Sequence, residues 1–191
     1  MKKIIEIGYK FLYLQDKIKT PKQIMHYKYC GICGKELVDH PAGDDGMVPY
    51  CEKCQMYWFD SFSSCVIIMV VNEYDEIAML KQSYLSTEHE TFVSGYIKPG
   101  ENAETAAIRE VNEELGLSIE HLEYAGTYWF PSKELLMLGY IGNVKKTVFH
   151  LSSEVDSASW VSIEEAESHM FPERPGNTQH KIFRRWINGK K

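Results

Sequence analysis

The pattern of apolar and polar residues predicts regular elements from residue 65 onward. Short apolar runs bounded by Gly, Pro, Asn and Asp are typical of strands, and apolar residues three and four positions apart are typical of helices. The runs predict strands at 65–71, 77–81, 92–97, 124–130, 134–142, 147–151 and 158–163. Helical periodicity predicts helices at 103–115, 163–170 and 178–188. This mixture of elements indicates an α+β domain.

The predicted helix at 103–115 has sequence signals at both ends. Asn102 can cap its N-terminus, and Gly116 stands where a left-handed residue commonly ends a helix. One face is apolar and should pack on a core; it consists of Ala107, Ile108, Val111 and Leu115. The predicted last helix also has one apolar face, formed by Ile182, Phe183, Trp186 and Ile187.

A second face of the 103–115 helix carries three carboxylates. Glu110, Glu113 and Glu114 stand at i, i+3 and i+4, so their side chains are neighbours. Like charges at these spacings destabilise a helix by about 0.2–0.5 kcal/mol per pair. A divalent cation would remove this penalty, and hard oxygen ligands suit Mg²⁺ or Mn²⁺. For the three glutamates alone, a solvated helix face is the alternative interpretation.

The residues around these carboxylates resemble the Nudix box. That motif reads Gly, five residues, Glu, seven residues, Arg-Glu, an apolar residue, any residue, Glu-Glu, any residue, Gly, and an apolar residue. Every fixed position is matched here, by Gly95, Glu101, Arg109, Glu110, Val111, Glu113, Glu114, Gly116 and Leu117. The resemblance implies a Nudix fold, which is a mixed β-sheet sandwiched between α-helices. It also implies hydrolysis of a nucleoside diphosphate derivative by attack of water on phosphorus.

The resemblance further implies roles for individual residues. The expected ligands of Mg²⁺ or Mn²⁺ are Glu110, Glu113, Glu114, Glu154 and a backbone carbonyl of Ser94 or Gly95. Arg109 and Glu101 are expected to brace the loop before the helix against the helix itself. Glu114 and Glu154 are alternatives for the base that deprotonates water. Taken alone, Glu154 would be interpreted as a surface carboxylate.

Four of the five cysteines form two CxxC pairs, Cys30–Cys33 and Cys51–Cys54. This spacing is typical of a zinc ion held by four thiolates, and such a closed site is structural because no position is open to substrate. Redox chemistry is the alternative, but it usually needs one CxxC at a helix start. The fifth cysteine, Cys65, begins an apolar run and is expected to be a buried, inert thiol.

The order of the modules resembles that of NADH pyrophosphatases, over about residues 20–191. In that family a four-cysteine zinc module precedes an aromatic-rich linker and a Nudix domain. FVSGYIKPGE, LLMLGYIG and EVDSASWVSIEEA are similar to segments of the family's Nudix domain. The resemblance implies an N-terminal segment at 1–29, a small zinc ribbon at 30–57 and a Nudix hydrolase domain at 58–191. The larger amino-terminal domain of the long family members has no expected counterpart.

The substrate loop departs from that family. The family motif Gln-Pro-Trp-Pro-Phe-Pro-any-Ser falls on residues 128–135, where only Pro131 is retained. Tyr128, Trp129 and Phe130 could stack on a base or nicotinamide ring, although strand aromatics more often belong to a core. The best expectation is cleavage of NADH or NAD⁺ to AMP and nicotinamide mononucleotide. Alternatives are an ADP-ribose or noncanonical nucleoside triphosphate pyrophosphohydrolase, and a non-catalytic zinc-ribbon module that binds protein or RNA.

Size and charge narrow the expected partners. The chain has 191 residues, 44% hydrophobic content and a net charge of −6, so bulk electrostatic binding of nucleic acid is not expected. No apolar run approaches the ~20 residues of a membrane span, and the start lacks the apolar region of a signal peptide. We therefore expect a cytoplasmic protein whose partner is a nucleotide small molecule. A homodimer is compatible with the sequence.

Overall fold

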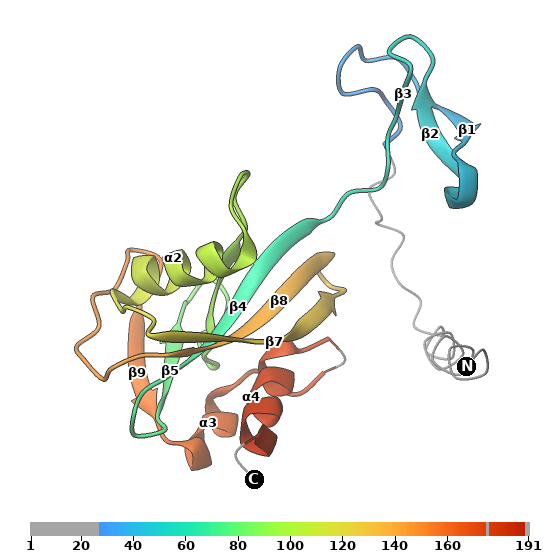
Figure 1. Ribbon diagram of the computed structural model, residues 1–191. Helices are drawn as coiled ribbons and strands as arrows, with labels where there is room; N and C mark the ends of the chain where they lie inside the picture. Colours follow the sequence, from blue (N-terminus) through green and yellow to red (C-terminus); the bar gives the residue numbers. More distant parts are fainter. Residues whose placement is uncertain (1–26, 175, 190–191) are drawn as a thin grey trace, which may run out of the picture. The chain divides into compact units, whose positions relative to one another are not determined.

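The computed structural model describes residues 27–174 and 176–189 (Figure 1). Most of the predicted N-terminal segment, 1–29, lies outside the described residues. The chain divides into two compact units, Met1–Ser61 and Phe62–Lys191. No helix in the described parts of the chain is long and apolar enough to cross a membrane.

The first unit contains a three-stranded antiparallel sheet in the order β1-β2-β3. Its elements are β1 (Val38–Pro41), η2 (Gly43–Asp45), β2 (Met47–Cys51) and β3 (Met56–Tyr57). Within residues 27–61, only Cys30, Val48 and Cys51 have buried apolar side chains. Such a small core cannot stabilise a fold without a cross-link or a metal ion.

The second unit contains a mixed sheet in the order β7-β8-β4-β5-β9, with β6 also paired to β4. The strands are β4 (Ser63–Val71), β5 (Ile77–Lys81), β6 (Val93–Tyr96), β7 (His121–Phe130), β8 (Leu135–Asn143) and β9 (Ser157–Val161). The helices are α2 (Ala103–Leu115), α3 (Ile163–His169) and α4 (Thr178–Gly189). Strands β4 and β8 are parallel, whereas the other pairs are antiparallel.

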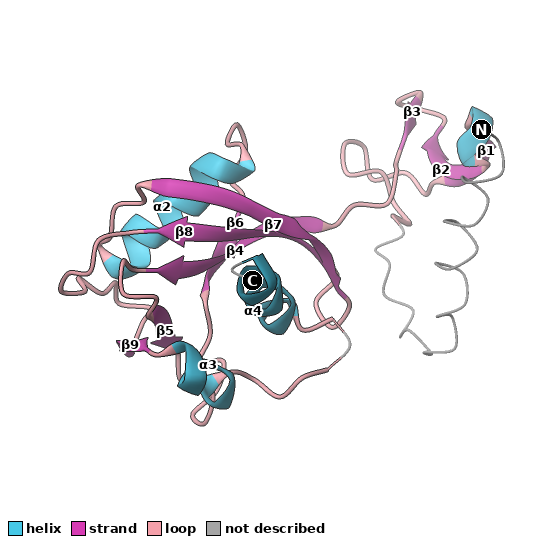
Figure 2. Cartoon of the chain, turned by 60° about the horizontal axis from the view of Figure 1, so that its bottom comes forward, coloured by secondary structure: helices cyan, strands magenta, loops and turns pink. Residues whose placement is uncertain are grey.

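Helices cover both faces of this sheet (Figures 1 and 2). Strand β4 is apolar along most of its length because it is buried on both sides. Its residues Val66, Ile68 and Val70 belong to one core cluster with Ala106, Ala107, Val111 and Leu115 of α2. The intervening Cys65, Ile67 and Met69 belong to a second cluster with Ile182, Phe183 and Trp186 of α4. The predicted fold, a mixed sheet between α-helices, is confirmed.

The strand predicted at 147–151 is wrong. This segment instead contacts the C-terminus of α2. The N–H of His150 donates to the carbonyl of Leu115 at 2.9 Å, and the N–H of Ser152, just after the segment, donates to the carbonyl of Glu114 at 3.3 Å. The last carbonyls of a helix need such partners. A Cβ atom at Gly116 would lie 2.6 Å from the Cβ of His150, so this close approach requires glycine.

The apolar face predicted for α2 is correct except at one position. Ile108 is 47% exposed, and Ala106 instead joins Ala107, Val111 and Leu115 in the core. The buried stripe is therefore shifted by one residue at the start of the helix, which leaves the carboxylate face unchanged.

Candidate active site

Helix α2 is fixed at both ends by the residues that the sequence indicated. The side-chain oxygen of Asn102 accepts a hydrogen bond from the N–H of Thr105 at 2.8 Å. Gly116 has φ 68° and ends the helix, and its N–H donates to the carbonyl of Asn112. These caps satisfy backbone groups that would otherwise lack partners.

Arg109 joins the loop before α2 to the helix. Its Nε and Nη2 donate to the two carboxylate oxygens of Glu101 at 2.7 and 3.0 Å, and Nη2 also donates to the Tyr96 carbonyl at 3.1 Å. Its Nη1 donates to Glu110 at 2.6 Å and to Glu113 at 2.9 Å. Charge-assisted bonds of this kind are roughly twice as strong as neutral ones. Arg109 thus fixes the position of two of the three clustered carboxylates.

Glu101 completes this brace. One of its oxygens also accepts a hydrogen bond from the N–H of Lys98 at 3.0 Å. The hydrogen bonds from Arg109 and from this N–H lower the pKa of Glu101 to about 2, so the carboxylate stays charged at any ordinary pH. The contacts expected of Arg109 and Glu101 are therefore present, and they tie the 96–101 loop to the helix.

Glu114 is a buried carboxylate among other carboxylates. Its side chain is only 5% exposed, and Oε2 has no hydrogen-bond partner among the described residues. Burial, followed by the charges of Glu110, Glu154 and Glu113, raises the pKa of Glu114 to about 8. Glu154 thus lies near the helix cluster although it is distant from it in sequence. An unpartnered buried oxygen surrounded by carboxylates matches the oxygen ligands that Mg²⁺ and Mn²⁺ prefer.

The backbone of β6 approaches the same cluster. A Cβ atom at Gly95 would lie 2.1 Å from the carboxyl carbon of Glu110, so no larger residue fits there without displacing that carboxylate. Ser94 and Gly95 line the cleft described below together with Glu110, Glu113 and Glu154. The structure therefore places Glu110, Glu113 and Glu154 at one cleft with Ser94 and Gly95, and Glu114 near enough for the charges of those three carboxylates to act on it. Among the described residues, the carboxylate oxygens do not form a closed ligand cluster as they stand.

The raised pKa of Glu114 predicts how stability depends on pH. Its ordinary pKa is 4.5 and the folded value is about 8, so the native state binds this proton more tightly than the unfolded state. The favourable contribution is complete below pH 4.5 and is lost as the pH rises to about 8. At about 1.4 kcal/mol per pKa unit, this difference corresponds to about 5 kcal/mol at most. Relaxation around the buried charge reduces it, so without divalent cation the wild type should lose of the order of 3 kcal/mol over this window relative to Glu114→Gln.

Urea unfolding of both proteins at pH 5 and pH 8.5, without added Mg²⁺ or Mn²⁺, measures this difference. Glu101 does not interfere, because its lowered pKa affects stability only below its ordinary value of 4.5. The same pH dependence in wild type and variant would show that Glu114 is not held in a charge-repelling site.

Glu110, Glu113 and Glu154 line a cleft of about 1040 Å³. Apolar side chains form much of its wall, including Ile67, Phe130, Leu135, Met137 and Phe171. Tyr84 and Tyr96 also line it and are 69% and 58% exposed. Neither tyrosine was predicted as a site residue. Tyr96 directly follows the Gly95 of the box, which was a usable signal, whereas nothing in the local sequence marks Tyr84.

Of the three aromatic residues proposed to stack on substrate, only Phe130 lines this cleft. Successive side chains of a strand point to opposite faces, so Trp129 points away and packs edge-on against Phe62 at 5.5 Å. Tyr128 donates a hydrogen bond to the Ala125 carbonyl at 2.6 Å, and the Lys181 ammonium lies 5.4 Å from its ring centre. The stacking hypothesis is therefore retained for Phe130 alone.

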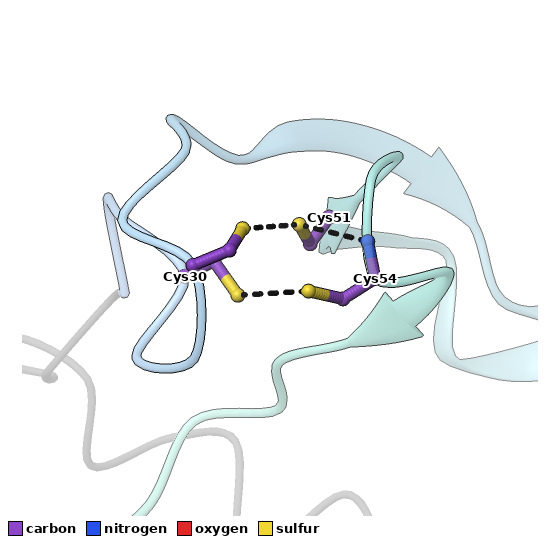
Figure 3. A group of neighbouring side chains, drawn as sticks. Cys30, Cys51 and Cys54 are labelled. Carbon is purple, nitrogen blue, oxygen red and sulfur yellow. Dashed lines mark hydrogen bonds between the residues drawn. The ribbon is translucent and has the colours of Figure 1, made fainter.

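The four paired cysteines converge in the first unit, and the side chains of Cys30, Cys51 and Cys54 point toward one another (Figure 3). All four sulfurs lie within 4.8 Å of one another. The Cys30–Cys54 and Cys33–Cys51 sulfur distances are 3.8 and 3.6 Å. Four thiolates around zinc at about 2.3 Å would lie about 3.8 Å apart. The cluster therefore fits a tetrahedral zinc ion.

Comparison with known proteins agrees with this geometry. The family model described as NUDIX domain matches residues 62–187. The chain is 28% identical over 152 residues to a protein of Pseudomonas fluorescens named NAD-capped RNA hydrolase NudC, covering 79% of this chain and 52% of that protein. A protein of the same name from Pseudomonas aeruginosa is 28% identical over 140 residues, covering 73% and 49%. The chain thus spans about half the length of these curated relatives.

Solved structures show the same fold. A Nudix hydrolase from Nitrosomonas europaea matches with a TM-score of 0.64 and 17% identity, covering 86% of this chain and 92% of that one. The Nudix domain of Shewanella oneidensis NrtR, complexed with ADP ribose, matches with a TM-score of 0.59 and 12% identity, covering 74% and 94%. At these identities the likeness concerns the fold alone. Because the family model covers most of the chain and the Nudix box is complete, the chain belongs to the Nudix family.

Proposed function

We propose that this protein hydrolyses the diphosphate linkage of a nucleoside diphosphate derivative with the help of Mg²⁺ or Mn²⁺. The observation that carries the proposal is the buried, unpartnered Glu114 oxygen, on which the charges of Glu110, Glu113 and Glu154 act, next to a cleft that those three carboxylates line. Glu110, Glu113, Glu114 and Glu154, with a carbonyl of Ser94 or Gly95, would hold the cation. The cation would neutralise negative charge on the diphosphate oxygens and would lower the pKa of the attacking water.

The chain's own residues position this chemistry. Arg109 holds Glu110 and Glu113 through hydrogen bonds, and Glu101 anchors Arg109 from the loop. Glu114 and Glu154 remain the two candidates for the base that accepts the proton of water. Glu114 is buried and Glu154 is exposed, so exchange of the accepted proton with solvent is easier at Glu154.

NADH and NAD⁺ are the best candidate substrates, with AMP and nicotinamide mononucleotide as products. The order of modules supports them, as does the likeness to proteins named NAD-capped RNA hydrolase. The name of these relatives also makes the NAD-bearing end of an RNA a candidate substrate. The altered loop at 128–135 argues against strict dinucleotide specificity, so ADP-ribose and noncanonical nucleoside triphosphates remain alternatives.

A non-catalytic binding module fits the structure less well. A buried carboxylate without a partner destabilises a fold, and the neighbouring carboxylates increase that cost. A protein that no longer binds a cation gains nothing from such an arrangement. The intact cluster therefore favours an enzyme.

We also propose that Cys30, Cys33, Cys51 and Cys54 hold a structural zinc ion in a ribbon at 30–57, ahead of a hydrolase domain at 58–191. The small apolar core within residues 27–61 supports this, because that stretch buries few other side chains that could stabilise it. A cytoplasmic location is a separate proposal, and a homodimer is compatible with the sequence.

Steady-state kinetics with identified products tests the choice of substrate. We expect measurable NADH cleavage, with kcat/KM within ~10-fold of that for ADP-ribose, or ~1.4 kcal/mol in transition-state binding. The panel should contain NADH, NAD⁺, ADP-ribose and several nucleoside triphosphates, each with Mg²⁺ and then with Mn²⁺. Hydrolysis of triphosphates alone would refute the NADH assignment.

A further inference from the structure

Two of the positively charged side chains that line the cleft have no role in the proposed hydrolysis. The Lys and Arg side chains that line it are Lys98, Arg109, Lys133 and Arg174. Arg109 is bound by Glu101, Glu110 and Glu113, and the Lys98 ammonium lies 3.8 Å from Glu113. Both of these cations are therefore already paired with carboxylates of the box.

Lys133 and Arg174 are different. Among residues 27–174 and 176–189, neither forms an ion pair or a side-chain hydrogen bond, and both side chains are exposed. The nearest acid along the chain to Arg174 is Glu173, which is already bound by both terminal nitrogens of Arg184 at 2.6 Å. In a chain of net charge −6, two unpaired cations in one cleft attract an anion from solution.

The two loops that carry these cations pack against each other. A Cβ atom at Gly176 would lie 2.7 Å from the Cδ of Pro131, so the Arg174 loop contacts the turn that carries Lys133. The Asn177 side chain donates to the carbonyls of Phe171 and Pro172, which fixes the Arg174 loop from its other end. The two cations therefore come from neighbouring loops that both line the cleft.

Cys65 of strand β4 also lines the cleft. Burial raises the pKa of its thiol to about 11, and the positive charge of Lys133 acts in the opposite direction. Phosphate monoesters and diesters are the nucleotide groups that such a pair of cations recognises, because they accept charge-assisted hydrogen bonds from both.

We propose that Lys133 and Arg174 form a second anion subsite, which binds a ribose phosphate that the substrate carries in addition to its diphosphate. This inference rests on the proposed function, and it adds that nucleotides with an extra phosphate bind more tightly than the corresponding nucleotides without one. Such a phosphate occurs as a 2′-monoester on a dinucleotide, or as the 3′-phosphate that begins an RNA chain. The shared chemistry is a phosphate on the adenosine ribose.

Ligands without an anhydride bond test the subsite independently of turnover. Calorimetric titration of the full chain at low ionic strength, with and without Mg²⁺, would compare AMP with adenosine 2′,5′-bisphosphate and adenosine 3′,5′-bisphosphate. We expect at least one bisphosphate to bind roughly 10-fold or more tightly than AMP, and this ratio to fall as salt is added. A 2′ preference would indicate phosphorylated dinucleotides, and a 3′ preference would indicate the end of an RNA.

Variants distinguish binding at Lys133 and Arg174 from a general effect of the protein's positive charges. In the double variant Lys133→Gln/Arg174→Gln, the ratio of bisphosphate to AMP affinity should fall close to 1. Lys145→Gln removes one charge outside the cleft, where Lys145 lies 3.8 Å from Glu120, and should keep the wild-type ratio. Equal affinity of the wild type for all three ligands, no measurable bisphosphate binding, or a ratio that survives in the double variant would overturn the inference. Failure of NADH hydrolysis alone would refute only the proposed function.

Discussion

Glu113→Gln and Glu114→Gln are each expected to lower kcat/KM for diphosphate hydrolysis at least about 100-fold. Loss of groups that merely support metal ligands commonly costs 10–100-fold in affinity or activity, so loss of a ligand should cost at least as much. Glutamine has nearly the same shape, and in Glu114→Gln it removes a buried charge that other carboxylates repel. The fold should therefore persist, and the metal-free Glu114→Gln protein should be the more stable one above pH 8.

Rates for the purified variants, with Mg²⁺ and with Mn²⁺, measure this effect, and circular dichroism checks the fold. Glu164→Gln is a matched control, since Glu164 is an exposed glutamate in the first turn of α3 and does not line the cleft. Near-normal rates in both cluster variants would refute the assignment of the cation site.

The second large effect concerns zinc. The protein should contain about one tightly bound Zn²⁺ per chain, and Cys30→Ser should unfold the first unit while leaving the second largely intact. Structural zinc sites in small modules supply about 10–16 kcal/mol of apparent binding free energy. The first unit has few other buried contacts within its described residues, so it cannot compensate for such a loss.

Elemental analysis gives the zinc content, and amide hydrogen exchange shows where protection is lost. Protection should disappear in β1, β2 and β3 and persist in β4 and α2. Cys65→Ala is the matched control, because Cys65 lies outside the sulfur cluster and its loss should leave the zinc content unchanged. Absence of zinc from protein produced with adequate metal would refute the zinc site.

The features predicted correctly are those encoded over a short stretch of sequence. The bounds of β5 and α2 match their predictions because the short apolar run of β5, the Asn102 cap and the Gly116 stop are all local signals. The convergence of the four cysteines follows from the spacing of their two pairs. In each case one contiguous segment carries all the chemistry that determines the outcome.

The failures depend on contacts between distant segments. Residues 147–151 are rich in the apolar and β-branched types that favour strands, but the backbone of His150 pairs with the C-terminus of α2 instead of a neighbouring strand. Tyr84 and Arg174 reach the cleft from loops that no local pattern marks as functional. The prediction that Tyr128, Trp129 and Phe130 all stack on substrate fails for a local reason, since successive side chains of a strand point to opposite faces and cannot all face one cleft.

Release of AMP from NADH and ADP-ribose by the wild-type protein, with and without divalent cation, tests the central claim most directly. We expect AMP to form with Mg²⁺ or Mn²⁺ and to fall to background when neither is added, since the carboxylates of α2 and Glu154 would then hold no cation. If neither cation supports AMP release from either compound, or if AMP forms equally well without them, the account of this site is contradicted.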